Sequence, residues 1–183
     1  MKQSIKAVCL GDSITWGFPY GPEVSWVTML NKSLDGQFIN KGINGNTTSD
    51  MLKRFERAVL TYQPTHLVLM GGINDVICGE SLDRIKLNLQ TMAQRAMQEN
   101  IMVILGMPTA VDMPGIENIL KKLRTWIKQF AEEKQLKVIH FEKAFYDKNG
   151  ALRDDLLLPD GGHPTAQGYQ EMFKQIDLNI FKA

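Results

Sequence analysis

Ser13 and His163 are the two residues whose chemistry points first to catalysis. Ser13 stands in a Gly-Asp-Ser turn, and His163 ends an Asp-Gly-Gly-His segment near the other end of the chain. A serine hydroxyl is a weak nucleophile until a base takes its proton, and neutral imidazole suits that task near neutral pH. Asp160 could hold one ring nitrogen of His163 so that the other faces Ser13. These residue types predict a serine nucleophile, a histidine base and an aspartate that orients the base.

Nucleophilic attack on a carbonyl also requires donors that stabilise the negative charge of the tetrahedral intermediate. The backbone N–H groups of Ser13 and Gly45 could supply two donors, and the side-chain amide of Asn74 a third. Gly45 has no side chain, so its backbone can approach a substrate closely. We therefore expect Ser13, Gly45 and Asn74 to form an oxyanion hole.

Five short apolar runs, of which the second is weaker and broken by Asn40 and Lys41, provide the elements that would position these residues. They are bounded by glycine and polar residues and read as buried parallel strands. The runs cover residues 5–10, 38–43, 67–70, 101–105 and 138–141. The polar clusters 11–13, 44–47 and 71–75 follow the first three strands, and 160–163 precedes the last helix. Because ligands bind at the carboxyl ends of such strands, the clusters should meet at one edge of the sheet.

Amphipathic helical patterns separate the strands. A helix is expected over residues 26–34, and Ser81 could cap the second of four helical stripes. The stripes are Met51, Phe55, Val59 and Tyr62; Leu82, Ile85, Leu89, Met92, Ala93 and Ala96; Ile116, Ile119, Leu120, Leu123, Ile127 and Phe130; and Ala166, Tyr169, Phe173, Ile176 and Ile180, with Pro164 near its first turn. Alternating strands and helices predict a parallel sheet covered on both faces.

The segments GDSITWG, NGNT, GGIND and DGGH resemble the four blocks of the GDSL lipase/esterases, also called SGNH hydrolases. The resemblance runs from the first strand to the last helix. It implies a single domain over 1–183 with a flavodoxin-like three-layer α/β/α sandwich of about five strands. It also implies the catalytic triad and oxyanion hole, formed by Ser13, Asp160, His163, Gly45 and Asn74. The one departure within the blocks is Asn44, where the family usually has serine.

Several further residues have structural alternatives to a functional role. Asp12 and Asp75 are expected to hold turns, and His66 and His140, at strand ends, to be structural. Trp16, Phe18 and Trp26 fit either a pocket wall or the core. Residues 107–114 follow the fourth strand and should form an apolar wall of the site. We expect substrate contacts from Trp16, Phe18, Pro108 and Val111.

Composition excludes several other classes of protein. The 183 residues carry a formal net charge of +1 without a basic stripe, so no nucleic-acid partner is expected, and the run Lys121, Lys122 and Arg124 reads as a solvated helix face. Nucleotide-binding glycine motifs, a Gly-x-Ser-x-Gly elbow and His-Glu-x-x-His are missing from the sequence, so neither cofactor nor metal is expected.

The expected compartment is the cytoplasm. The apolar run after Met1 is too short for a signal peptide, and no stretch approaches the roughly 20 apolar residues of a membrane span. Cys9 and Cys78 lack metal-ligand spacing, which favours a reducing setting. We expect no stable membrane association, and the oligomeric state stays open.

The leading functional hypothesis is a serine esterase that acts through an acyl-enzyme. Its substrate would be a small or lipid-derived acyl ester or thioester, and short acyl chains are expected to react faster than palmitoyl. One alternative is a carbohydrate O-acetylesterase. An alternative from another class is a non-catalytic flavodoxin-like binding domain, which would need no matched serine, asparagine and histidine.

Overall fold

The computed structural model describes residues 4–182, which form an α/β fold around one five-stranded parallel sheet. The single domain was expected to cover residues 1–183, and residues 1–3 and 183 of that range lie outside the described part. The strand order is β2-β1-β3-β4-β5. The strands are β1 (Ile5–Gly11), β2 (Gly36–Gly42), β3 (His66–Leu69), β4 (Met102–Gly106) and β5 (Lys137–Ile139). Each expected strand is present, with ends that differ by one or two residues.

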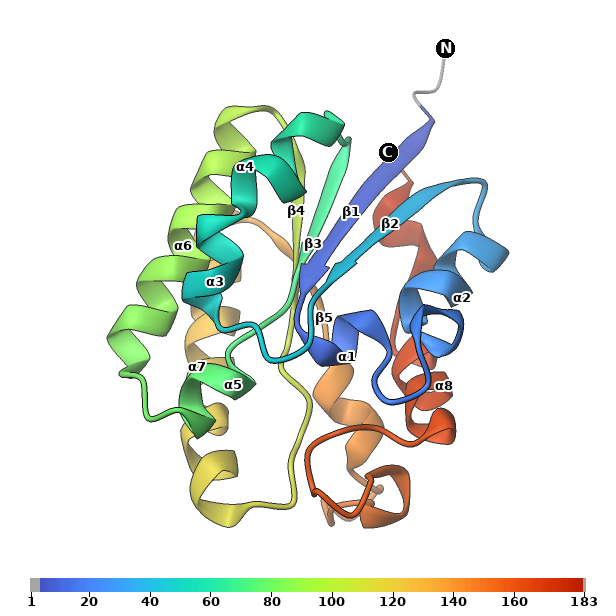
Figure 1. The fold of residues 1–183 in the computed structure, drawn as a ribbon, viewed down its shortest axis with the longest axis vertical. Helices are drawn as coiled ribbons and strands as arrows, with labels where there is room; N and C mark the ends of the chain where they lie inside the picture. The colour runs from blue at the N-terminus through green and yellow to red at the C-terminus, as the bar shows by residue number, and fades with distance from the viewer. Residues whose placement is uncertain (1–3, 183) are drawn as a thin grey trace.

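Helices cover both faces of the sheet, so the molecule has the predicted three layers (Figure 1). One layer holds α2 (Trp26–Ser33) and α8 (Ala166–Lys174), and the other holds α3 (Thr48–Lys53), α4 (Phe55–Ala58), α6 (Leu82–Gln98) and α7 (Pro114–Lys134). The short helices α1 (Ser13–Trp16) and α5 (Ile73–Ile77) follow β1 and β3 directly. Ser81 caps α6 by accepting a hydrogen bond from the Arg84 N–H, as expected.

The centre of the sheet is fully buried because helices cover both of its faces. Residues 7–10 of β1 are entirely inaccessible, and all four residues of β3 are buried. The chain moves outward from β1 in opposite directions, first to β2 and then to β3. Such a reversal opens a crevice at the carboxyl ends of β1 and β3, where ligands bind in this kind of sheet. Ser13 and Asn74 lie immediately beyond those two ends.

The helix expected along the stripe from Met51 to Tyr62 is interrupted in the structure. It is divided into α3, α4 and a 3₁₀ turn, Leu60–Tyr62. The break falls at Arg54, whose backbone leaves helical geometry (φ −99°, ψ 4°). Its side chain turns inward to hydrogen-bond acceptors at the ends of β1 and β2, an arrangement that a stripe of apolar residues cannot reveal.

The C-terminal stripe is interrupted in the same way. Helix α8 ends at Lys174, and a separate 3₁₀ turn covers Leu178–Phe181. Asp177 starts that turn by accepting a hydrogen bond from the Asn179 N–H at 2.9 Å. Among the described helices, none has the length and apolar character needed to cross a membrane.

Candidate active site

Ser13 is the first residue of α1, directly after the turn that ends β1. The turn is held by Asp12, whose Oδ1 accepts a hydrogen bond from the Ile14 N–H at 2.9 Å and caps the helix. Ser13 is only 5% exposed, so most of its surroundings are protein. Asp12 thus has the structural role expected of it, and the nucleophile candidate is fixed at the edge of the sheet.

His163 lies beside Ser13 although 150 residues separate them. The distance from Ser13 Oγ to His163 Nε2 is 2.9 Å, and that from His163 Nδ1 to Asp160 Oδ2 is 2.7 Å. Partial burial acts to raise the pKa of Asp160, but hydrogen bonds from the backbone N–H groups of His163 and Gly162 and from the imidazole outweigh it, so this pKa lies below its ordinary value. An ionised Asp160 can only accept, so Nδ1 carries the hydrogen, and in the neutral imidazole Nε2 is then left to accept from Ser13. This is the geometry of a serine–histidine–aspartate triad.

Phe18 holds the imidazole from one side. The two ring centroids are 4.5 Å apart with the planes tilted by 50°. The Tyr169 hydroxyl, on the buried face of α8, donates to the Phe18 carbonyl at 2.8 Å and fixes this segment. Phe18 therefore restricts the orientation of His163.

Asn74 faces the same pocket from α5. Its Nδ2 donates one hydrogen bond to the Asn46 carbonyl at 3.0 Å, which leaves the second amide hydrogen for another acceptor. Gly45, one residue before Asn46, is exposed with φ +76°, a left-handed conformation that favours glycine. Its N–H donates to no acceptor among residues 4–182. The structure thus places a free amide hydrogen and a free backbone N–H on adjoining segments.

Asp75 links the segment that carries Asn74 to the segment that follows Gly45. Its carboxylate accepts from the Thr48 N–H at 3.0 and 2.9 Å and from the Thr48 hydroxyl at 2.5 Å. Burial raises the pKa of Asp75 despite these bonds. Asn88 on α6 donates to the Thr48 hydroxyl at 3.0 Å. Asp75 therefore joins α5 to the start of α3, which confirms its predicted structural role.

A pocket of about 170 Å³ opens over Ser13, Asn74 and His163. Its apolar wall consists of Ile14, Ile73, Ile77 and Met113. Substrate contacts were expected from Trp16, Phe18, Pro108 and Val111, but none of these four residues lines this pocket. The expected loop does contribute, but through Met113. Ile73 and Ile77 are one helical turn apart. A helix predicted over residues 73–77 would have placed both side chains on one face, beside Asn74, and so would have indicated that they line the pocket.

The loop 107–113 presents Met113 and not Pro108 or Val111 because a buried ion pair holds its first part inward. Arg124 on α7 donates to the Pro108 and Thr109 carbonyls at 2.8 and 2.7 Å and to Glu117 at 2.6 and 3.0 Å. Glu117 accepts from the Val111 N–H at 3.1 Å. Arg124 was expected on a solvated helix face, which is wrong: its neighbours Lys121 and Lys122 are exposed, but Arg124 is 8% exposed.

The remaining histidines lie apart from the site. His66 is buried at the start of β3 and its Nδ1 is 2.7 Å from the Thr65 hydroxyl. His140 follows β5 and its Nδ1 is 3.0 Å from Glu142 Oε1. Across residues 4–182, no group of three or more His, Cys, Asp or Glu side chains is arranged to hold a metal ion.

Comparison with known proteins agrees with this geometry. The chain is 26% identical over 175 residues to the esterase TesA of Pseudomonas aeruginosa, covering 91% of this chain and 83% of that protein. It is also 26% identical over 144 residues to an acetylxylan esterase of Geobacillus stearothermophilus, covering 72% and 66% of the two chains. A solved G-D-S-L family protein from Desulfitobacterium hafniense superimposes with a TM-score of 0.88 at 28% identity, covering 97% of this chain and 99% of that one.

The family model described as the GDSL-like Lipase/Acylhydrolase family matches residues 9–171. That match begins within β1, before Ser13, and extends into α8, beyond His163. It therefore spans every element that carries a residue of the candidate site. The chain belongs to the GDSL-like lipase/acylhydrolase family, within the SGNH hydrolases, and is an ester-bond hydrolase.

Proposed function

We propose that the protein hydrolyses short-chain carboxylic esters through an acyl-enzyme on Ser13. The observation that carries this proposal is the chain of two hydrogen bonds, 2.9 and 2.7 Å, from Ser13 through His163 to Asp160 beside a small apolar pocket. A nucleophile, a base in the required tautomer and an ionised orienting carboxylate are the parts that acyl transfer needs.

In the first half of the cycle, His163 Nε2 takes the Ser13 proton as Oγ forms a bond to the ester carbonyl carbon. The Asn74 amide and the N–H groups of Gly45 and Ser13 stabilise the oxyanion. His163 then gives its proton to the leaving oxygen, and the bond from that oxygen to the acyl carbon breaks. In the second half, His163 takes a proton from water, which attacks the acyl carbon and releases the acid as Ser13 regains its proton.

The pocket favours short acyl groups. About 170 Å³ with one apolar wall can cover only the first carbons of an acyl chain, and Ile77 at its edge is 51% exposed. Each buried methylene adds about 0.8 kcal/mol of binding, but only where protein covers it. We therefore expect kcat/KM to stop rising within the range from acetyl to hexanoyl esters. The proposal includes thioesters with the same acyl groups.

A second candidate is deacetylation of a carbohydrate. The likeness to an acetylxylan esterase favours this alternative, because an acetyl group fits the same small pocket. Nitrophenyl esters from C2 to C16, acetylated sugars and acyl-CoA thioesters, compared by kcat/KM below micelle-forming concentrations, would separate the candidates. A maximum at C12 or longer would contradict the short-chain proposal.

The catalytic assignment itself is tested at Ser13. A fluorophosphonate should add one label to the wild-type protein and none to Ser13→Ala, whose kcat should fall by a factor on the order of 10⁶. A folded Ser13→Ala variant that keeps a tenth of the wild-type activity would show that the nucleophile is another residue. Absence of labelling and turnover in the wild type would favour a binding domain.

We also infer that the protein works in a reducing compartment, the cytoplasm. Cys9 is buried and Cys78 is exposed, and both are free thiols. An exposed unpaired thiol is typical of proteins that are kept reduced. Cell fractionation followed by thiol labelling would test this, and recovery of the protein in an oxidising compartment would contradict it.

A further inference from the structure

Arg54 is a buried cation that interacts with the oxyanion side of the site without touching the pocket. The residue is 9% exposed and has no carboxylate within ion-pair distance in the described part of the chain. Burial lowers the pKa of its guanidinium, yet arginine stays charged in proteins because its ordinary pKa is so high. A buried charge without an ionic partner needs strong hydrogen-bond acceptors.

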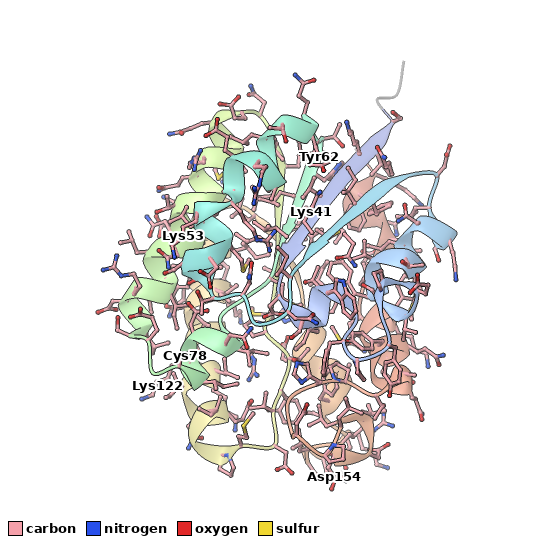
Figure 2. The ribbon with its side chains drawn as sticks, viewed as in Figure 1. Lys41, Lys53, Tyr62, Cys78, Lys122 and Asp154 are labelled. Atoms are coloured by element: carbon pink, nitrogen blue, oxygen red, sulfur yellow. The ribbon has the colours of Figure 1, made fainter. Side chains whose placement is uncertain are left out.

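The acceptors that Arg54 finds belong to three separate segments. Nη2 donates to the Gly11 carbonyl at 2.8 Å and to the Lys41 carbonyl at 3.0 Å, and Nε donates to Asn46 Oδ1 at 2.7 Å. Gly11 ends β1 two residues before Ser13, and Lys41 lies near the end of β2. The side chain of Lys41 points instead toward Tyr62, with its ammonium 4.2 Å from the ring centre (Figure 2). The planar guanidinium therefore joins two strand ends to the loop that follows β2.

Asn46 transmits this anchoring to Asn74. Its side chain accepts from Arg54, its N–H donates to the Ile43 carbonyl at 3.2 Å, and its own carbonyl accepts from Asn74 Nδ2 at 3.0 Å. The hydrogen bond to Asn74 fixes the plane of that amide and thereby the direction of its second N–H. Gly45, the other donor of the loop, is adjacent to Asn46 and moves with it.

We propose that Arg54 is a positioning residue that acts through Asn46 on the oxyanion donors Asn74 and Gly45; the inference rests on the proposed function. Transition-state stabilisation requires donors that are already oriented when charge develops. Loss of the anchor frees the loop 43–46 and allows the Asn74 amide to rotate. Arg54 is not among the residues that line the pocket, so kcat should fall while KM changes little.

The test is a double-mutant cycle between Arg54→Met and Asn74→Ala. Arg54→Met should lower kcat by up to about 10²-fold, the effect of a small misplacement of catalytic groups. In the Asn74→Ala background the same substitution should cost clearly less than that factor, because Gly45 is then the one donor of the two left to position. Lys53→Met is the matched control: Lys53 is adjacent in sequence, lies on the surface with its side chain 77% exposed, and should leave kcat unchanged (Figure 2).

A second pair of variants tests the same contact without removing a buried charge. Asn46→Leu loses the acceptor for Arg54 but keeps the backbone carbonyl that binds Asn74, so it should reproduce the kcat loss of Arg54→Met. Asn46→Asp keeps an acceptor oxygen and should retain most of the wild-type kcat. Because Asn46 is half-buried in a loop, this pair decides the question if Arg54→Met does not fold.

The outcomes separate the two proposals. Wild-type kcat in folded Arg54→Met or Asn46→Leu, or equal losses in both backgrounds of the cycle, would overturn the role of Arg54 and leave the proposed function intact. Wild-type kcat in Asn74→Ala would overturn the oxyanion role of Asn74, and the inference on Arg54 would fall with it.

Discussion

Ser13 and Asn74 lie on short helices that begin where strands end, whereas Asp160 and His163 lie in a loop of turns and bends. The first pair is backed by the most buried strands and by the hydrogen bonds of Asp75 and Arg54. The second pair is more open, with side chains 45% exposed for Asp160 and 30% for His163. The proposed nucleophile and oxyanion donor thus lie against the core, whereas the proposed acid–base pair lies in a more exposed loop that contacts Phe18 and Asp112.

This difference corresponds to what each half has to do. Oxyanion donors work because they are fixed before charge develops, so rigidity improves them directly. In the proposed mechanism the imidazole exchanges a proton with Ser13, the leaving group and water, and therefore needs access to solvent and some freedom of position. Rigidity in this site is therefore greatest around the proposed oxyanion donors. Substitutions in the two halves should for that reason have different effects on kcat.

The largest expected effect is at the base. His163→Ala should lower kcat by a factor on the order of 10⁶, and Asp160→Ala by about 10⁴, because the carboxylate orients the base without taking its proton. Both variants should unfold close to the wild-type midpoint, since their side chains are partly exposed. Steady-state kinetics with folding checked by circular dichroism would measure this. Equal losses in two folded variants would mean that Asp160 does more than orient.

The other half should respond at Asn74 with a smaller loss. Asn74→Ala should lower kcat by about 10²–10³-fold with little change in KM, as removal of one oxyanion donor does. The measurement is a full saturation curve with a short-chain nitrophenyl ester. An increase in KM at constant kcat would instead assign Asn74 to ground-state binding of the substrate and would weaken the contrast between the halves.

Gly161 tests how the acid–base loop is held. It has φ +71°, and a Cβ added there would lie 3.0 Å from the Asp112 carbonyl, whose own N–H donates to the Gly161 carbonyl at 2.7 Å. Gly161→Ala should therefore shift the loop and lower kcat by up to about 10²-fold. Gly162→Ala is the control, since its Cβ would make ordinary contacts, with Met113 Cε at 3.5 Å and Asp160 Oδ1 at 4.0 Å. Equal kcat values for the two variants would show that the loop adapts freely.

The smallest expected effect concerns Asp12, which belongs to the buried half. Burial is the main cause that raises its pKa to about 6. A carboxyl group whose pKa is raised on folding favours the native state at low pH, and that contribution disappears as the pH rises from about 4 to about 6. Asp12→Asn keeps an acceptor for the Ile14 N–H and removes the charge.

Relative to wild type, Asp12→Asn should therefore gain stability across this pH range, by at most about 3 kcal/mol for a shift of roughly two pKa units. Denaturant unfolding of both proteins at pH 4 and pH 7 measures the difference. A constant difference between the two pH values would mean that Asp12 titrates normally, and that the turn before Ser13 is more hydrated than its burial indicates.

The sequence was sufficient to predict those parts of the molecule that depend on local patterns of apolar and polar residues. Five runs bounded by glycine and polar residues predicted the parallel sheet. The runs of β1, β3 and β4 are the clearest, because strands buried on both faces must be apolar throughout, whereas β2 and β5 are edge strands that are only partly buried. The order of polar clusters after those strands brought Ser13, Asn74 and His163 to one edge, since parallel strands end together. The role of Asp12 also follows from local hydrogen-bonding chemistry, since its partner is Ile14, whereas the partner of Asp75 is Thr48, 27 residues away on another helix.

Only the tertiary structure decided which charged side chains of the expected helices face inward. Arg54 follows the exposed Lys53, and Arg124 follows the exposed Lys121 and Lys122. Both arginines are nevertheless buried because backbone carbonyls of other segments accept their hydrogen bonds, from the ends of β1 and β2 for Arg54 and from the loop before α7 for Arg124. The hydrogen bonds from Arg124 to the start of the loop also explain why Met113, and not Pro108 or Val111, lines the pocket. Hydrophobic periodicity records which residues avoid water, but the acceptors that allow a charge to be buried come from parts of the chain far away in sequence.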